Sequence, residues 1–255
     1  MRRLALLAVP FALAACGGSG GSKGVADHTV STTTPANASA TVNHAIARTS
    51  KVSVHAQFSG VVTAAGQKVH MDGSGDVDPK SRRGTMHLTM SLAGQQIPFD
   101  EVLDGKTVYV ASSFFTSFLP SGKKWLKVTL SAASNLGAAG FALTSEPGAV
   151  PPLQDVKSLG GGTYSGRVDE AKLSQSQKAA LAGTHAKFGP VKISVGNDGY
   201  VHRLELVSSS SAGGKKARIV LTTTMSSFGT PVHVTIPPSA ETLDASNAGI
   251  PGFSS

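Results

Sequence analysis

Over residues 52–236 apolar and polar side chains alternate in short runs, and this period of two is the sequence feature that most constrains the fold. In the first run Val54, Ala56 and Phe58 alternate with His55 and Gln57. Because successive side chains of a strand point to opposite faces, each run predicts a strand with one apolar and one polar face. We therefore expect an antiparallel sheet that is wetted on one side. Further runs lie at 85–92, 108–110, 126–130, 191–195, 202–206, 219–225 and 232–236.

Residues that favour tight turns separate these runs, because Asn, Asp and Gly tolerate the positive φ that hairpin turns need. The segment Asp72–Asp78 begins like a calcium-binding loop, but Val77 stands where the loop needs glycine and Arg83 where it needs glutamate, so we expect a turn there too. About ten strands at such short spacing predict a meander. The turn residues are Ala65-Gly66, Asp78-Pro79, Ala93-Gly94, Asp104-Gly105 and Asn197-Asp198-Gly199.

Helix signals are few and short. We expect helices over Thr41–Ser50, over the alanine-rich segment Ser131–Thr144, and from a capping box at Ser174 to Leu181. A sheet of this size twists and tends to curl, and its apolar face must be covered. The predicted fold is therefore α+β: a large curved antiparallel sheet of about 10–11 strands, a half-barrel, with short helices on its concave face. We expect those helices to leave part of the apolar concavity unfilled, which suits a hydrophobic ligand.

The N-terminus has the form of a lipoprotein signal. A basic start precedes twelve apolar residues, too few to cross a bilayer, and Leu13-Ala14-Ala15-Cys16 resembles the bacterial lipobox. The resemblance implies cleavage before Cys16 and acylation of its thiol, which would anchor the chain to the cell membrane on the extracytoplasmic face. We expect a signal peptide over 1–15, a Gly/Ser/Thr-rich flexible tether over 16–40, one domain over 41–245 and a tail over 246–255.

Composition excludes several classes of protein. Cys16 is the single cysteine, which excludes an internal disulfide framework and a multi-cysteine metal site. The net charge is +8, but the Lys and Arg are scattered without interleaved aromatics, so we expect no nucleic-acid partner. The eight His do not form a zinc-hydrolase motif, and the neighbours Asp100 and Glu101 face opposite sides of a strand. We therefore predict no enzyme activity, no cofactor and no metal site.

Six short segments follow one another along the chain: Ile97–Val110, Lys124–Val128, Tyr164–Asp169, Gly199–Leu204, Phe228–Val232 and Ile236–Pro238. Their order resembles that of the LppX/LprG family of bacterial envelope lipoproteins, whose fold is similar to that of LolA. The resemblance implies an eleven-stranded half-barrel with helices on its concave side. It also implies an internal cavity for acyl chains, binding of acylated glycolipids or related lipids, and no catalysis or cofactor.

We therefore expect a membrane-anchored lipoprotein that binds an acyl lipid or glycolipid in its cavity and carries or presents it in the cell envelope. One alternative is an envelope sensor that uses the same fold to bind a protein partner. Another is an envelope hydrolase, which predicts titratable groups clustered in a polar cleft. Deformable methionines and large apolar side chains suit irregular acyl chains. The predicted cavity residues are Val54, Phe58, Met86, Leu88, Met90, Phe114, Phe115, Phe118, Leu119, Leu136, Phe141 and Met225.

Overall fold

The structure, a computed structural model, describes residues 35–64, 66–115, 119–129, 150–173, 175, 178, 186–212 and 215–245. Its helical elements are α1 (Pro35–Thr49) and the short 3-10 helices η1 (Ser113–Phe115), η3 (Glu170–Lys172) and η4 (Ser239–Glu241). The strands of the first half are β1 (Val54–Ala64), β2 (Gln67–Asp78), β3 (Arg83–Leu92), β4 (Gln95–Asp104), β5 (Thr107–Ser112) and β6 (Trp125–Thr129). Those of the second half are β7 (Leu153–Gly160), β8 (Thr163–Val168), β9 (Lys187–Phe188), β10 (Val191–Val195), β11 (Val201–Ala212), β12 (Lys215–Ser226) and β13 (Thr242–Asp244).

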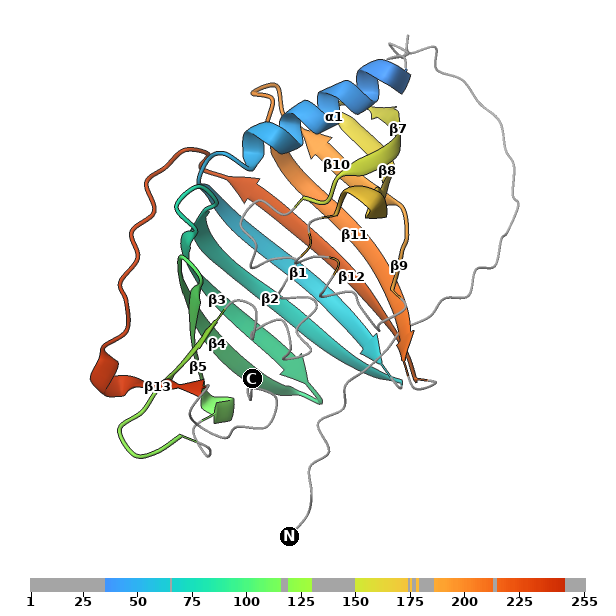
Figure 1. Ribbon diagram of the computed structural model, residues 1–255. Coiled ribbons are helices and arrows are strands. Elements are labelled where there is room, and N and C mark those ends of the chain that lie inside the picture. The colour runs from blue at the N-terminus through green and yellow to red at the C-terminus, as the bar shows by residue number, and fades with distance from the viewer. Residues whose placement is uncertain are drawn as a thin grey trace.

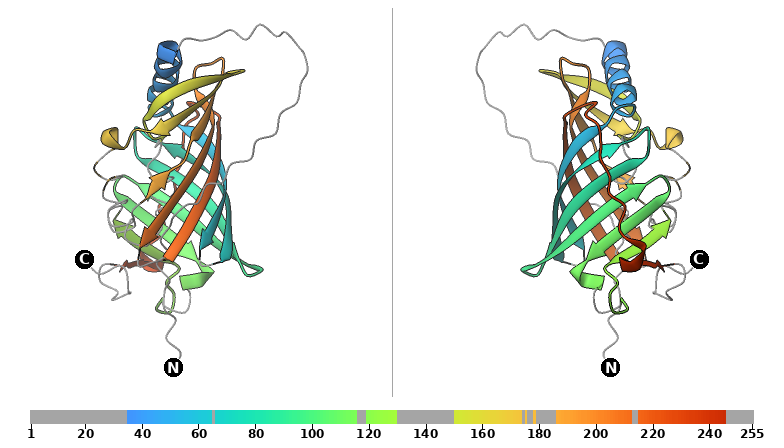
Figure 2. Two further views of the ribbon diagram at one scale, coloured as in Figure 1. Left: turned by 90° about the vertical axis from the view of Figure 1, so that its right-hand side faces the viewer. Right: turned by 90° about the vertical axis from the view of Figure 1, so that its left-hand side faces the viewer.

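The thirteen strands of the described chain form one twisted, curved sheet (Figures 1 and 2). The strand order is β13-β6-β5-β4-β3-β2-β1-β12-β11-β10-β8-β7, with β9 paired to β11. Every pairing is antiparallel except that of β13 with β6, which is parallel. The expected large antiparallel sheet is confirmed, and it has more strands than the ten or eleven expected.

Glycines form the hairpin turns where the sequence predicted them. Gly66, Gly94, Gly105 and Gly199 all have φ between 65° and 83°, a region that side chains with a Cβ disfavour. Gly66, Gly94 and Gly105 close the hairpins β1–β2, β3–β4 and β4–β5. The meander β1 to β6 therefore follows from local turn chemistry.

The predicted turn at Asp72–Asp78 is wrong, because this segment lies inside β2. A Cβ on Gly73 would lie 2.4 Å from the Phe58 ring, and one on Gly75 would lie 2.1 Å from the Thr85 carbonyl oxygen. These glycines therefore serve close packing within the sheet: Gly73 leaves room for the Phe58 ring, and Gly75 lets β3 come near.

Helix α1 begins at Pro35, earlier than the expected Thr41, so the last residues of the predicted tether belong to the helix. Ala38, Val42 and Ala45 are fully buried, and the helix packs mainly against β7 and also against β10 and β11. The Thr49 hydroxyl donates to the Ala45 carbonyl at 2.9 Å and accepts from the Val201 N–H at 2.9 Å, which ties the helix end to the sheet. Within the described residues no helix is long and apolar enough to span a bilayer.

The other predicted helices fall on parts of the chain that are not described. The whole of 131–144 lies outside the described residues, and of the segment 174–181 only residues 175 and 178 are described, both helical. The predicted signal peptide, Cys16 and the predicted tail over 246–255 also lie outside.

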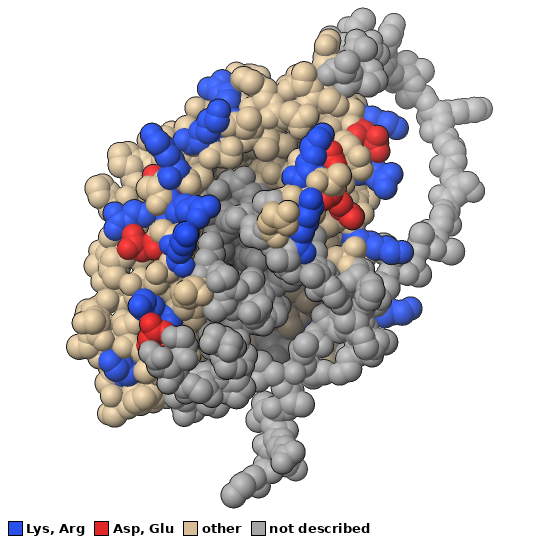
Figure 3. Space-filling view, in the orientation of Figure 1, with Lys and Arg blue, Asp and Glu red and all other residues tan. Residues whose placement is uncertain are grey.

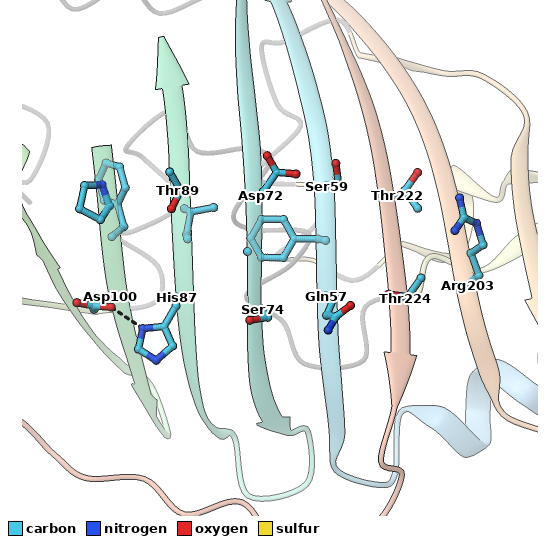
Figure 4. A pocket seen from close by; sticks show the side chains of 15 residues that line it. Gln57, Ser59, Asp72, Ser74, His87, Thr89, Asp100, Arg203, Thr222 and Thr224 are labelled. Atoms are coloured by element: carbon cyan, nitrogen blue, oxygen red, sulfur yellow. Dashed lines mark hydrogen bonds and ion pairs between the residues drawn. The ribbon is translucent and has the colours of Figure 1, made fainter. Parts of the chain in front are cut away.

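The sheet has two chemically different faces. One face, called the apolar face below, packs with α1 into the main core, and a smaller second cluster lies towards β5, β6 and β13. The opposite face, called the polar face, presents Ser, Thr, His, Asp and Gln side chains from the same strands (Figure 4). Side chains of the apolar face include Phe58, Met71, Val77, Met86, Leu88, Leu204, Leu221 and Met225. The sequence predicted this division from the period of two.

Candidate functional site

The centre of the apolar face holds most of the predicted cavity residues that the structure describes. Phe58, Met86, Leu88 and Met225 are all buried members of the main core, and their exposed fractions lie between 2% and 9%. Val54, at the start of β1, is buried as well. Their packing places them together on one surface, within the core and in contact with one another; their role as cavity residues stays a prediction.

The remaining predicted residues are dispersed. Met90 is partly buried beside the main core, and Phe115 and Leu119 pack against the second cluster. Phe114 is 46% exposed, with its ring edge-on to that of Phe115 at 5.5 Å between centroids. The other predicted positions, Cys16, Phe118, Leu136 and Phe141, lie outside the described residues.

Glu101 is the charged residue that sequence reasoning did not assign to the apolar face. It lies on β4 directly opposite Met86 of β3 on one side and Val110 of β5 on the other. Its neighbours two residues away on the same strand and face are Phe99 and Leu103. Glu101 therefore sits where the main core meets the second cluster, among apolar side chains.

The Glu101 carboxyl lines a small cavity of about 20 Å³, together with Val77, Gly84, Thr85, Met86, Leu103 and Val108. Among the described residues no hydrogen bond or ion pair reaches this carboxyl. Burial away from water raises the pKa of Glu101 from 4.5 to about 7, and no group of the described chain compensates its charge. The cavity holds about one water-sized group.

A much larger hollow, about 800 Å³, crosses the polar face as an open groove (Figure 4). Two rows of side chains border it, drawn from β4, β3, β2, β1, β12 and β11. The backbone forms its floor at Phe58, Gly73, Leu88 and Phe99, whose own side chains belong to the other face. The bordering rows consist of Gln57, Ser59, Asp72, Ser74, His87, Thr89, Asp100, Arg203, Thr222 and Thr224. The groove therefore offers hydroxyl, amide and charged groups to a polar ligand or partner.

One row of the polar groove places Ser74, His87 and Asp100 side by side on three neighbouring strands. His87 Nδ1 lies 2.5 Å from Asp100 Oδ1, but no hydrogen bond joins Ser74 to His87 in the described structure. A serine nucleophile needs that hydrogen bond and backbone N–H donors for an oxyanion. Strands β2 and β3 are each paired on both sides, so their N–H groups are used within the sheet. This row is therefore not arranged as a catalytic triad.

Other charged groups of the described chain stabilise turns. The Ser81 hydroxyl lowers the pKa of Asp78 by a hydrogen bond, and the Lys172 ammonium does the same for Asp169. The backbone N–H of Tyr200 lowers the pKa of Asp198, helped by His202. Within the described residues no three His, Cys, Asp or Glu side chains gather as metal ligands.

Comparison with known proteins gives no assignment. No protein-family model matches the chain, and no curated protein matches it. Among solved structures, the chain is similar to a DUF1329 family protein from Desulfovibrio piger. That match has 12% identity and a TM-score of 0.24, and it covers 80% of this chain and 96% of the other. A likeness at this level carries no argument about fold or function, so the resemblance to the LppX/LprG family stays a prediction.

Proposed function

We propose that the protein is a lipid-anchored envelope protein that binds an acyl lipid or glycolipid against its apolar face and carries or presents it. The observation that supports this proposal is the make-up of that face: one continuous apolar surface from β4 through β12, with the deformable side chains Met71, Met86 and Met225 among it. A half-barrel of the LolA type, anchored through Cys16, is part of the same proposal.

The physical benefit of such a protein is large. A C16 chain in water costs on the order of 10 kcal/mol at ~0.8 kcal/mol per methylene, so unassisted transfer between membranes is slow. An apolar protein surface that takes up the chain removes most of that barrier without any chemical step.

Binding at the cavity beside Glu101 requires that part of the apolar face to open. Sites for small-molecule ligands enclose about 300–1,000 Å³, whereas the cavity beside Glu101 has about 20 Å³. The acyl chain must therefore displace contacts that the core side chains now make with one another. Methionine side chains suit this exchange because three rotatable bonds let them repack around a ligand.

The direct test is to purify the protein from its own membrane, extract it with organic solvent and identify the extract by mass spectrometry. We expect a stoichiometric acyl lipid. Failure to find any acyl lipid above the level in a matched extract of an unrelated lipoprotein would contradict the proposal.

The polar groove favours a second function, that of a sensor which binds a protein partner. Its size, about 800 Å³, and its exposed polar side chains suit recognition of a polar surface. Crosslinking in native envelopes from a photoreactive residue at Thr89, which borders the groove, distinguishes the two functions. Recovery of one specific protein supports the sensor function, and recovery of lipid alone argues against it.

A further inference from the structure

Glu101 is a charged residue among the apolar side chains of the apolar face. The groups around it indicate which kind of ligand group would pair with its carboxylate. The titratable or charged groups on its own strand, Asp100 and Asp104, belong to the opposite face, where they contact His87 and Arg83. On β3 the facing side chain is that of Met86, and on β5 the facing side chains are those of Val108 and Val110. Within the described chain, therefore, no cation faces this carboxyl.

A carboxyl group in such a place is costly unless a donor reaches it. A buried charged group is retained in proteins where it is paired or where it acts on a ligand. Glu101 also lines a cavity with room for about one water-sized group, and apolar side chains continue from that cavity on both sides. The Glu101 carboxyl is therefore a polar group at one position of an otherwise apolar surface.

From this arrangement we infer that Glu101 is a head-group subsite of the apolar face, and that it selects acyl lipids whose head group carries a protonated amine; a long-chain alkylamine is the simplest probe of that class. The ammonium group occupies the cavity beside Met86 and donates hydrogen bonds to the Glu101 carboxylate, while the chain lies along the apolar side chains. An acid head group is repelled at the same place. This inference rests on the proposed function and names the ligand class of that apolar face.

The experiment measures binding of three C12 probes, dodecylamine, dodecanol and dodecanoic acid, to the purified protein by titration calorimetry below their aggregation concentrations. We expect dodecylamine to bind at least tenfold more tightly than dodecanoic acid at pH 8, with dodecanol between them. Glu101→Gln keeps the size of the side chain and removes its charge, so it should abolish the preference for the amine and leave dodecanol binding within about threefold. Glu170→Gln, the same change at an exposed site in η3, should alter nothing.

The pH dependence provides an independent readout. An alkyl amine stays protonated over pH 6–8, because amines of this type have pKa values near ~10. The Glu101 carboxyl ionises near pH 7, so the amine affinity should rise from pH 6 to pH 8 in the wild type and stay flat in Glu101→Gln. A circular dichroism melt of each variant verifies that it is folded.

The outcomes separate the two proposals. If all three probes bind equally and Glu101→Gln changes nothing, the subsite is wrong and the apolar-face function stands. If none of the probes binds to the folded protein, the proposed function fails and the subsite fails with it. A preference for the amine that survives in Glu101→Gln also overturns the assignment of Glu101.

Discussion

Thr49 shows how a single polar residue fixes the helix to the sheet. Its buried hydroxyl closes two hydrogen bonds, one within α1 and one to the Val201 N–H of β11. The residue is 1% exposed, so water cannot replace either partner. Neighbouring contacts add to this junction, because the Arg48 guanidinium lies over the Tyr200 ring at 4.5 Å and Tyr200 stacks on Phe228 at 4.6 Å.

The first prediction concerns that hydroxyl. Thr49→Val keeps the shape but leaves the buried Val201 N–H without its acceptor, so we expect the free energy of unfolding to fall by about 1–3 kcal/mol. Thr49→Ser, which keeps the hydroxyl, should lose less. Urea denaturation of the three proteins measures the difference, and equal stability of Thr49→Val and wild type would contradict the role of this hydrogen bond.

The second prediction concerns Glu101 and pH. Its pKa is raised from 4.5 to about 7 in the folded protein, so between these values the unfolded chain is ionised while the folded one stays protonated. Unfolding then releases a proton, and stability falls as pH rises from about 4.5 to 7 and is constant above. At ~1.4 kcal/mol per pKa unit the cost at pH 8 is about 3 kcal/mol, which is an upper value because Glu101 is only half-buried.

Comparison with Glu101→Gln isolates this effect. The variant should be more stable than wild type at pH 8 and lose the slope between pH 5 and 7, while Glu170→Gln follows the wild type. Unfolding midpoints in urea across that pH range supply the measurement. A wild-type slope that persists unchanged in Glu101→Gln would show that another group causes it.

At the scale of elements, the packing of β2 depends on Gly73 and Gly75. Both lie in the segment that the sequence analysis interpreted as a turn. The Cβ of an alanine at position 75 would meet the backbone oxygen of Thr85 at 2.1 Å, and a backbone atom of a central strand cannot move aside cheaply. Close approach of β2 and β3 therefore requires glycine there.

The third prediction follows from that contact. We expect Gly75→Ala to lower the free energy of unfolding by about 1–3 kcal/mol or more, the range for overpacking in a core. Ser74→Ala, at the adjacent position on the polar face, should stay within about 0.5 kcal/mol of wild type. Thermal melts distinguish the two, and a Gly75→Ala protein as stable as Ser74→Ala would refute the packing argument.

Alternation predicts strands correctly where their pairing is regular. The alternating run at 232–236 lies in no strand, so that expectation is wrong. Strands β1, β3 and β12 are regular, so alternation alone identified them. The sequence pattern did not predict strand β7, because its pairing with β8 shifts register and Asp155 adopts a positive φ of 54°. Both features break the period of two. Strand β13 is three residues long and pairs in parallel with β6, a long-range contact without local signal.

The candidate site was predictable in part. Phe99, Glu101 and Leu103 share one parity along β4, so the sequence already contained the sign that Glu101 belongs with apolar neighbours. The position of its cavity required knowing that Met86 and Val110 flank it on adjacent strands. The groove across the polar face was not predictable, because it depends on the register of six strands and on the curvature of the sheet.

At the scale of the whole molecule, the two faces of one sheet offer two different surfaces. The helix, both core clusters and Glu101 lie on the apolar face, and the groove lies on the polar face. In Figure 3 Lys and Arg side chains stand along both flanks of the face shown, and the net charge of +8 favours contact with anionic lipid surfaces. The proposed lipid carriage would use such contact when the protein loads and unloads its ligand.

The measurement that tests the central claim most directly is photo-crosslinking with a C16 fatty alcohol that carries a diazirine in mid-chain, followed by peptide mass spectrometry. The proposed function predicts one label per molecule, on peptides that contain the apolar-face residues Phe58, Met86 or Leu88, and competition by unlabelled hexadecanol. Labels confined to polar-face positions, or labelling that excess hexadecanol does not reduce, would contradict it.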